Sequence, residues 1–349
     1  MRDIVLSKII DIHKVNVIGL GAEKFSSGII KNIISSEQIQ INNIYVNKKN
    51  SSNFLLCNKS KFRYVDYKLG NLSRLFEIIF WSFLHHSKHD ILVLGDLPLN
   101  TSAQQYVLCH QSLMFKKYSK LNKNYYKYLL FRLIFKIFLK KNDIVVVQSK
   151  VMADKVKRSF GQGINTKIID IKHENYEWPE FTRYKRFSNL NDRFNLFYPS
   201  ADYPHKNHNL LSQLKINEKF QIKVTIDPKN NYKVRSNIKF LGSISREEVY
   251  NIYKRTDALL FLSSEESFGL PLAEAVKCNL PIICPYEDYT EFLSSQNCFY
   301  FKLSDPTSLI DAMNRLENKL KNNWWSNWNF NVVYSNDQFL TIDKIILDD

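Results

Sequence analysis

The feature that most constrains this chain is the stretch Ser263 to Pro285, which reads SSEESFGLPLAEAVKCNLPIICP. The apolar run DALLFL precedes it and has the length and composition of a buried strand. A loop containing Gly269 follows, and Pro271 then indicates the first position of a helix, because the missing N–H of proline has no intrahelical partner there anyway. Strand, glycine-containing loop and helix in this order predict a parallel α/β domain whose ligand lies at the carboxyl ends of its strands.

The start of this helix predicts an anion site. The backbone N–H groups of the four residues Ser267, Phe268, Gly269 and Leu270 are expected to point outward from the helix start, where the positive end of the helix dipole adds to their effect. A glycine in the loop lets a ligand approach the backbone closely. The typical ligand of such a site is a phosphate group.

Two carboxylates, Glu266 in the loop and Glu274 in the helix, lie on either side of this site. A carboxylate repels phosphate but accepts hydrogen bonds from hydroxyl groups. A ligand with a diphosphate in its middle and a sugar at each end would satisfy the whole arrangement. The alternative is a plain surface loop, with Glu274 stabilising the amino terminus of the helix.

The spacing of these residues resembles the signature of family-4 retaining glycosyltransferases of the GT-B fold. Seven residues separate Glu266 from Glu274, the segment Phe268-Gly269-Leu270-Pro271 lies between them, and Ala275 follows. The similarity runs from Asn195 to Leu293 and is looser in the first half of the chain. Family members usually have glycine where this chain has Asn279, a position after a helix end at which asparagine is acceptable.

The resemblance implies an α/β protein of the GT-B class, with two Rossmann-like domains facing a cleft and a C-terminal helix that crosses back. A chain of 349 residues is long enough for both domains. We expect an acceptor-side domain over residues 1–180, a nucleotide-sugar domain over residues 190–321, and a closing tail over residues 322–349 that packs across both. The polar segment Asn175 to Asp192, broken by Pro179, is a plausible linker.

In the first half, Val15 to Leu20 predicts a first strand, followed by a loop with Gly21. The resemblance implies that the amide of Gly21 approaches the donor phosphate. Two further predicted strands end at Asp96 and His110, where ligands of open α/β sheets bind. His110 is therefore a candidate contact to the donor sugar or the acceptor hydroxyl, and a purely structural histidine is an equally open interpretation.

In the second half, Lys206 lies where the resembled enzymes place a phosphate-binding lysine. Many members carry a further arginine several residues earlier, whereas this chain has Pro199-Ser200-Ala201. His205 and His208 flank Lys206, but histidine is mostly neutral at pH 7, and two histidines alone make a poor metal site. One of the two expected cations is therefore missing from the sequence pattern.

The leading functional hypothesis is transfer of a sugar from a nucleotide-diphosphate sugar to a saccharide acceptor in the synthesis of a bacterial surface polysaccharide. The resemblance implies retention of configuration, no metal and no cofactor beyond the donor substrate, and the chain has no Asp-x-Asp triplet. Lys206, Glu266 and His110 would be catalytic, and Glu274 would hold the ribose. The alternatives are a nucleotide-sugar epimerase or phosphorylase of the same fold, or a non-catalytic sugar-binding subunit of a polysaccharide assembly complex.

The net charge of +15 calls for a partner, although an AT-rich genome could inflate lysine without selection. Met114 to Asn142 contains nine Lys or Arg, no acid and many aromatic residues. This composition fits a helix on an anionic membrane surface, an ordinary core helix with a solvated face, or a nucleic-acid contact. No nucleic-acid fold motif accompanies it, so we expect no nucleic-acid partner.

The resemblance suggests a lipid-linked acceptor, which lies at the cytoplasmic face of the membrane. Together with the membrane interpretation of this stretch, it predicts a cytoplasmic protein that lies peripherally at the inner face of a bacterial plasma membrane. The first domain would dock through five basic residues: Lys116, Lys117, Lys120, Lys123 and Lys127.

Overall fold

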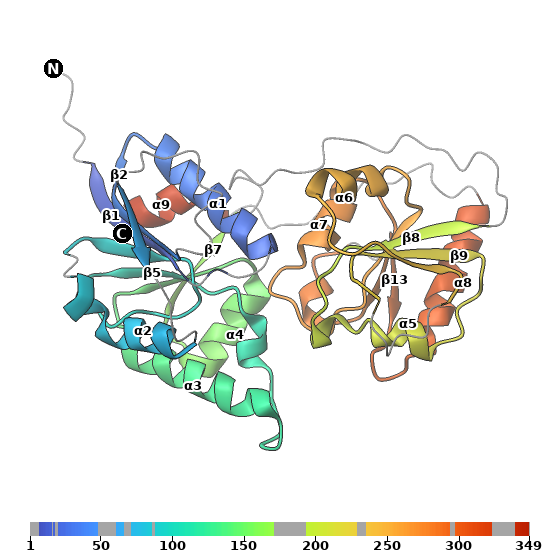
Figure 1. The fold of residues 1–349 in the computed structure, drawn as a ribbon, viewed down its shortest axis with the longest axis horizontal. Coiled ribbons are helices and arrows are strands. Elements are labelled where there is room, and N and C mark those ends of the chain that lie inside the picture. Colours follow the sequence, from blue (N-terminus) through green and yellow to red (C-terminus); the bar gives the residue numbers. More distant parts are fainter. Residues whose placement is uncertain are drawn as a thin grey trace. The chain divides into compact units, whose positions relative to one another are not determined.

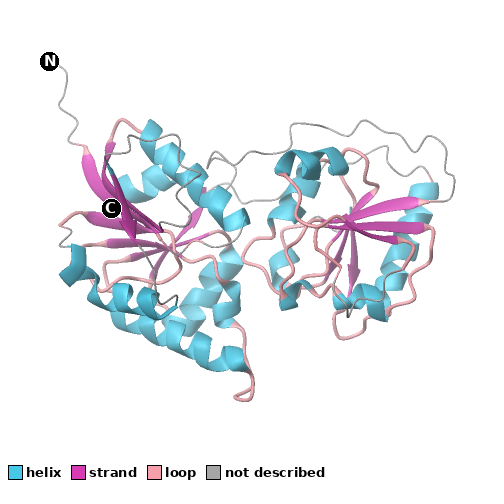
Figure 2. Ribbon diagram, in the orientation of Figure 1, coloured by secondary structure: helices cyan, strands magenta, loops and turns pink. Residues whose placement is uncertain are grey.

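The computed structural model describes residues 7–15, 17, 20–47, 61–65, 71–85, 88–170, 193–228, 235–293, 297–322 and 339–348. These residues form two compact units, each built on its own sheet (Figures 1 and 2). The first unit comprises Met1–Tyr176 and Asn336–Asp349, and the second comprises Glu177–Ser335. Each unit is an α/β domain of the Rossmann-like kind that the sequence predicts.

The first unit is organised around a parallel sheet. Its described strands are β1 (Lys8–Lys14), β2 (Ile39–Asn47), β3 (Phe62–Val65), β4 (Asp90–Val93), β5 (Gln105–Leu108), β6 (Ile144–Val147), β7 (Asn165–Ile169) and β14 (Phe339–Leu340). They follow the order β14-β7-β6-β5-β4-β1-β2-β3, and every neighbouring pair is parallel. The order changes direction between β1 and β4, so this is the switch point of the sheet.

Helices cover the sheet of the first unit. Those described are α1 (Leu20–Ser35), α2 (Asn71–His85), α3 (Lys123–Phe138), α4 (Lys150–Phe160) and α9 (Ile342–Leu347), with the short 3₁₀ helix η3 (Ser112–Phe115). Helices α2, α3 and α4 place Trp81, Phe135 and Met152 in one core with strand residues such as Val145. Helices α1 and α9 lie on the other side of the sheet (Figure 1).

The first strand does not lie where the sequence pattern predicts it. The prediction was Val15 to Leu20, whereas β1 ends at Lys14. The strand is hard to recognise because the polar residue Asp11 lies within it, fully buried. The carboxylate of Asp11 accepts hydrogen bonds from Asn42 Nδ2 and Asn43 N on β2, both at 2.9 Å, and these bonds offset the cost of burying it.

The second unit has a parallel sheet with the order β10-β9-β8-β11-β12-β13. Its described strands are β8 (Phe194–Tyr198), β9 (Phe220–Val224), β10 (Ile238–Phe240), β11 (Ala258–Leu260), β12 (Ile282–Pro285) and β13 (Cys298–Phe301). Its helices are α5 (Asn209–Gln213), α6 (Arg246–Tyr253), α7 (Leu270–Lys277) and α8 (Ser308–Lys321), with 3₁₀ turns η4 (Pro204–Lys206) and η5 (Asp288–Thr290). Strands β11 and β12 are buried at every position, as expected of a parallel sheet covered on both faces.

The end of the chain belongs to the first unit. Strand β14 pairs with β7, and α9 buries Ile342, Ile345 and Ile346. Residues 323–338, which contain the three tryptophans of the predicted tail, lie outside the described residues, so packing of the tail across both domains stays a prediction. In the described part of the chain, no helix is long and apolar enough to cross a membrane.

Candidate functional site

The order of the second sheet changes direction between β8 and β11, and this switch point locates the candidate site. Ligands of open α/β sheets bind beyond the carboxyl ends of the two strands at such a point. The segment after β8 carries Lys206, and the segment after β11 carries Glu266 and Gly269. The topology therefore gathers the residues that the sequence pattern singled out at one edge of one sheet.

Hydrogen bonds join these two segments to each other. The backbone N–H of Ser264 donates to the carbonyl of His205 at 2.8 Å, and Asn207 Nδ2 donates to the carbonyl of Leu262 at 2.9 Å. The hydroxyl of Tyr198, at the end of β8, donates to the carbonyl of Lys206 at 2.8 Å. These hydrogen bonds fix the backbone around Lys206 to β8 and to the segment after β11, and so they place the Lys206 side chain at this edge of the sheet.

Lys206 and Glu266 meet directly, with Nζ hydrogen-bonded to Oε1. Both side chains keep 14% of their surface exposed, so the pair is screened from bulk water yet reachable. Burial raises the pKa of the Tyr198 and Tyr289 hydroxyls nearby, and the Glu266 carboxylate adds to both shifts. These tyrosines therefore stay neutral, and Lys206 and Glu266 carry the charge at the centre of the site.

The start of α7 lies beside this pair. Gly269 occupies the N-cap in the left-handed region, with φ of 81°, and a Cβ there would lie 2.8 Å from Leu272 Cδ1. Glycine is needed at this position because other residues disfavour this φ and because their Cβ would collide with Leu272. Pro271 is the second helical residue instead of the predicted first, and it too lies where an N–H has no partner within the helix. The N–H of Leu270, the residue before Pro271, and the positive end of the α7 dipole are suited to bind an anion.

Glu274 is buried within the second unit and has protein partners. Its Oε2 accepts a hydrogen bond from the hydroxyl of Tyr253 at 3.1 Å, and its Oε1 lies 3.7 Å from Nη2 of Arg246. Sequence reasoning missed both partners. A signal was present for Arg246, since Ser245 and Glu248 form a capping box that marks the start of α6. Arg246 follows β10 and brings a second cation to this edge.

The segment Pro199-Ser200-Ala201, where the resemblance implies an arginine, has a structural role here. The backbone N–H of Ser200 donates to Thr225 Oγ1 at 2.8 Å, and Ser200 Oγ lies 2.7 Å from His208 Nε2. His208 is buried and its ring stacks on Tyr198 at 5.0 Å. His208 therefore packs the loop and does not replace the missing cation.

The helix end after Glu274 agrees with the prediction for Asn279. This residue adopts φ of 53°, and its N–H donates to the carbonyl of Val276 at 3.0 Å. The N–H of Leu280 donates to the carbonyl of Ala275 at 2.9 Å. These two bonds form a Schellman motif, in which asparagine takes the place of the usual glycine.

In the first unit, the switch point lies between β1 and β4, and the predicted residues Asp96 and His110 follow β4 and β5. Asp96 Oδ1 accepts the backbone N–H of His110 at 2.7 Å and lies 3.1 Å from its Nδ1. The His110 side chain keeps 18% of its surface exposed. With Nδ1 facing the carboxylate, Nε2 is the nitrogen left for a substrate group.

Gly21 lies in the first turn of α1 and is exposed, not in a loop as predicted. The same edge carries Lys14, whose Nζ lies 2.7 Å from Glu23 Oε1 and 3.0 Å from Ser27 Oγ. Burial lowers the pKa of Lys14, while the pairing with Glu23 partly offsets that shift. The Lys14 cation is therefore paired with residues of α1. Gly21 has no side chain and can contribute only its backbone N–H group.

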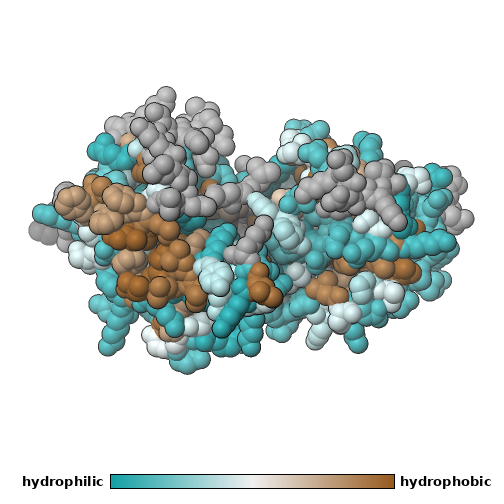
Figure 3. Space-filling view, turned by 60° about the horizontal axis from the view of Figure 1, so that its bottom comes forward, coloured by the Kyte–Doolittle hydropathy of each residue, from teal (hydrophilic) through white to brown (hydrophobic). Residues whose placement is uncertain are grey.

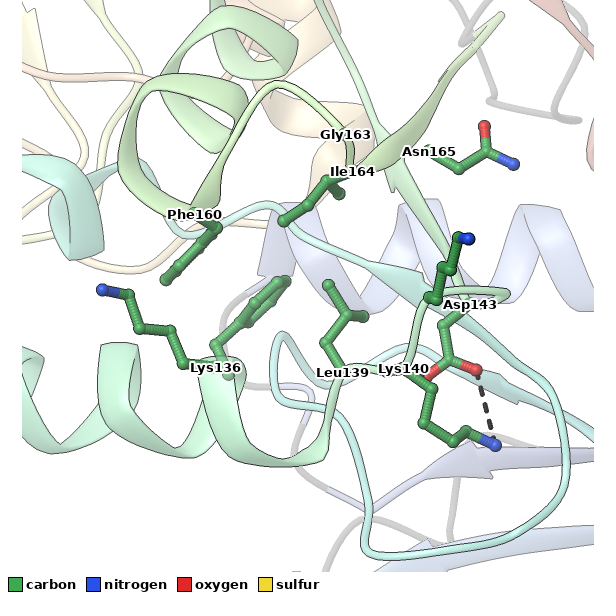
Figure 4. Close-up of a pocket in the computed structure, with 10 residues that line it drawn as sticks. Lys136, Leu139, Lys140, Asp143, Phe160, Gly163, Ile164 and Asn165 are labelled. Carbon is green, nitrogen blue, oxygen red and sulfur yellow. Dashed lines mark hydrogen bonds and ion pairs between the residues drawn. The ribbon is translucent and has the colours of Figure 1, made fainter.

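A separate hollow of about 190 Å³ lies in the first unit, at the amino ends of β6 and β7 (Figure 4). The rings of Phe135 and Phe160 stack at 4.4 Å in its wall, and Lys140 is held by Asp143 at 3.6 Å. Ligands of parallel sheets bind at the opposite ends of the strands. We therefore interpret this hollow as a gap between packed helices and not as a ligand site.

Comparison with known proteins agrees with this geometry. Residues 182–324 match the family model of glycosyl transferases group 1. The O-antigen chain mannosyltransferase RfbU of Salmonella typhimurium is 21% identical over 199 residues, a match that spans 54% of this chain and 54% of RfbU. The alignment thus covers only about half the length of that relative.

Solved structures show the fold. WaaG, a glycosyltransferase involved in lipopolysaccharide biosynthesis, superposes with a TM-score of 0.65 at 13% identity, covering 89% of this chain and 91% of WaaG. HepE from Anabaena, in complex with UDP and glucose, superposes with a TM-score of 0.58 at 14% identity, covering 91% of each chain. Residues 182–324 thus match the glycosyl transferases group 1 model, in agreement with the resemblance found in the sequence, and the chain has the GT-B fold, which confirms the predicted fold class.

Proposed function

We propose that this protein is a retaining glycosyltransferase that moves a hexose from a nucleotide-diphosphate sugar to a saccharide acceptor. The observation that carries the proposal is the cluster at the switch point of the second sheet. There, Lys206, the start of α7 and the hydroxyl-binding carboxylates Glu266 and Glu274 lie at one edge. This set matches a ligand with a central diphosphate and a sugar on each side.

In the reaction, the bond between the anomeric carbon and the diphosphate oxygen breaks, and its electron pair stays on the diphosphate. The acceptor hydroxyl oxygen bonds to the anomeric carbon, and its proton leaves with the diphosphate. Lys206 and the N–H of Leu270 at the start of α7 stabilise the charge that develops on the leaving group. The Lys206–Glu266 pair implies that Lys206 exchanges one anionic partner for another when the donor binds.

The two carboxylates take different parts of the donor. Glu266, with part of its side chain exposed, holds hydroxyl groups of the transferred sugar. Glu274, oriented by Tyr253 and close to Arg246, accepts hydrogen bonds from the ribose. Arg246 supplies positive charge at the same edge, a position that the sequence pattern did not reveal.

In the first unit, Nε2 of His110 contacts the transferred sugar or the acceptor hydroxyl, while Asp96 keeps the ring oriented. The first-turn amides of α1, at Gly21, approach the donor phosphate. The acceptor is a lipid-linked saccharide of a bacterial surface polysaccharide. The support is the O-antigen and lipopolysaccharide context printed for RfbU and WaaG.

The reaction proposed here needs no metal and no cofactor besides the donor. Cations for the leaving group come from Lys206 and Arg246.

A donor screen tests the proposal. Purified protein is heated with a panel of UDP-, GDP- and dTDP-sugars, and we expect sugars of one nucleotide to raise the melting temperature. The stabilising donor is then incubated with lipid-linked saccharides to detect transfer. No stabilisation by any nucleotide sugar would overturn the proposal, and conversion of the donor to an isomer without acceptor would replace it with an epimerase.

A further inference from the structure

The outer face of α2 and α3 exposes large apolar side chains along both helices. On α2 the exposed residues are Phe76, Ile79, Phe80, Phe83 and Leu84. On α3 they are Tyr126, Leu129, Leu130, Leu133 and Ile137. Within each helix they recur at intervals of three and four residues, so they form one stripe, while residues such as Trp81 and Phe135 on the other side fill the core.

The two stripes belong to one surface, which we call the α2–α3 face. The guanidinium of Arg74 on α2 lies 5.5 Å from the ring centre of Phe131 on α3, so the helices are neighbours. Figure 3 shows hydrophobic side chains gathered over the part of the first unit where these helices lie. The exposed fractions reach 77% at Phe83 and 60% at Ile137. A large group of exposed apolar side chains on one surface typically marks a site of interaction with another protein or a membrane.

The charge around the α2–α3 face indicates which kind of partner binds there. Between Asp96 and Asp143 the chain has no acidic residue, and the one acid of α2, Glu77, is buried against His13. Exposed cations lie on α3 and in the segment just before it, among them Lys116, Lys117, Lys120, Lys127 and Lys136. Two copies meeting through this face would place these like charges opposite one another. An anionic lipid surface offers both an apolar interior and negative charge.

We propose that the α2–α3 face inserts its apolar side chains into an anionic lipid bilayer, with the surrounding lysines at the headgroups. Helix α2 is the new participant, since the sequence pattern pointed only to Met114 to Asn142, with docking through lysines from Lys116 to Lys127. Insertion of aromatic and aliphatic side chains adds affinity that salt does not screen, whereas the lysine contribution falls as ionic strength rises.

The experiment is vesicle flotation with the full chain, using phosphatidylcholine vesicles with and without half phosphatidylglycerol. Wild-type protein should float with the anionic vesicles and stay in solution with the neutral ones. Phe83→Ser with Ile137→Ser keeps the net charge and should weaken binding about a hundredfold, at about tenfold for each side chain withdrawn from the bilayer. The matched control, Ile34→Ser with Tyr64→Ser, removes exposed residues outside the face and should bind like wild type.

A second pair of variants tests the charges. Changing Lys116, Lys117, Lys120, Lys123 and Lys127 to Gln should abolish flotation, because each basic residue near an anionic surface strengthens binding about fivefold. The control changes an equal number of lysines in the second unit: Lys215, Lys239, Lys254, Lys277 and Lys319. It should weaken binding less than about tenfold, because these lysines do not belong to the α2–α3 face.

Three results would overturn the inference. Wild-type protein could stay in solution with both kinds of vesicle. The Phe83→Ser, Ile137→Ser variant could float like wild type. Gel filtration could show a dimer that this variant dissociates, which would assign the face to a second copy. The assay uses no donor and docking does not depend on the transfer reaction, so its failure is distinguishable from failure of the proposed function, which calorimetry with nucleotide reports.

Discussion

The two sheets of this protein share a strand order around their switch points, yet the edges at those points carry different chemistry. At the edge of the second unit, Lys206 and Glu266 are paired with each other, remain partly exposed and lie beside the start of α7. At the edge of the first unit, the side chain of Lys14 is only 2% exposed and is committed to Glu23. Topology therefore locates both sites, while side-chain exposure decides which edge can receive a diphosphate.

This difference indicates that the first unit is suited to bind uncharged groups. Its partly exposed candidate residue is His110, whose Nδ1 lies 3.1 Å from Asp96, and its nearby lysine, Lys14, is already paired with Glu23. The second unit offers a cation, helix-start amides and hydroxyl acceptors together. We therefore propose that the charged groups of the second unit bind the donor diphosphate, while the first unit offers His110 to sugar hydroxyls and only backbone amides of α1 to the phosphate.

The largest expected effect that would sharpen this comparison comes from Lys206→Ala. We expect turnover to fall by roughly two to three orders of magnitude, since loss of one preorganised charge stabiliser costs about 3–4 kcal/mol in the transition state. Lys215→Ala, which removes an exposed lysine of the same unit, should leave turnover unchanged. Normal turnover in a folded Lys206→Ala protein would remove Lys206 from the mechanism.

A somewhat smaller effect is expected from His110→Ala in the first unit. Turnover should fall about ten- to a hundredfold, while the affinity for the free nucleoside diphosphate stays as in wild type, because the histidine contacts sugar and not phosphate. Asp96→Asn should lower turnover less, by releasing the ring. If His110→Ala instead weakened nucleotide binding, the division of labour between the two edges would fail.

Within the second unit, Glu274→Ala and Glu266→Ala should act on different quantities. Glu274→Ala should weaken nucleoside diphosphate binding about tenfold, through loss of hydrogen bonds to the ribose. Glu266→Ala should leave that affinity nearly intact and lower transfer, because its contacts are to the transferred sugar. Calorimetry with nucleotide alone separates the two, and equal losses for both variants would refute the assignment.

The smallest effect concerns the backbone at the start of α7. Gly269→Ala should lower the free energy of unfolding by about 1–2 kcal/mol, because alanine disfavours a positive φ and its Cβ would meet Leu272. Gly163→Ala, where a Cβ meets nothing within 4 Å, is the matched control. Thermal unfolding of both variants measures the difference, and equal melting temperatures would show that α7 starts without this constraint.

Much of the second unit could be predicted from the sequence because its signals are local. The run before Ser263, the glycine at position 269 and the acids at 266 and 274 follow one another along the chain. The capping role of Asn279 could be predicted for the same reason.

What escaped prediction depends on contacts between distant segments. Asp11 lies in a strand because Asn42 and Asn43 satisfy it, and nothing near Asp11 in the sequence reveals those partners. Arg246 joins Glu274 from another helix, and the exposed stripe of α2 becomes a surface only beside α3. When a helix carries apolar residues on several sides, as α2 does, its local pattern cannot show which side the core leaves uncovered.

The measurement that tests the central claim most directly is calorimetric titration of a nucleoside diphosphate into wild type, Lys206→Ala and His110→Ala. The nucleotide is the one whose sugars stabilise the protein against heat. The account predicts binding to wild type, a loss of at least about tenfold in Lys206→Ala, and unchanged affinity in His110→Ala. Equal affinity in all three proteins, or a loss confined to His110→Ala, would contradict the assignment of the donor diphosphate to the second unit.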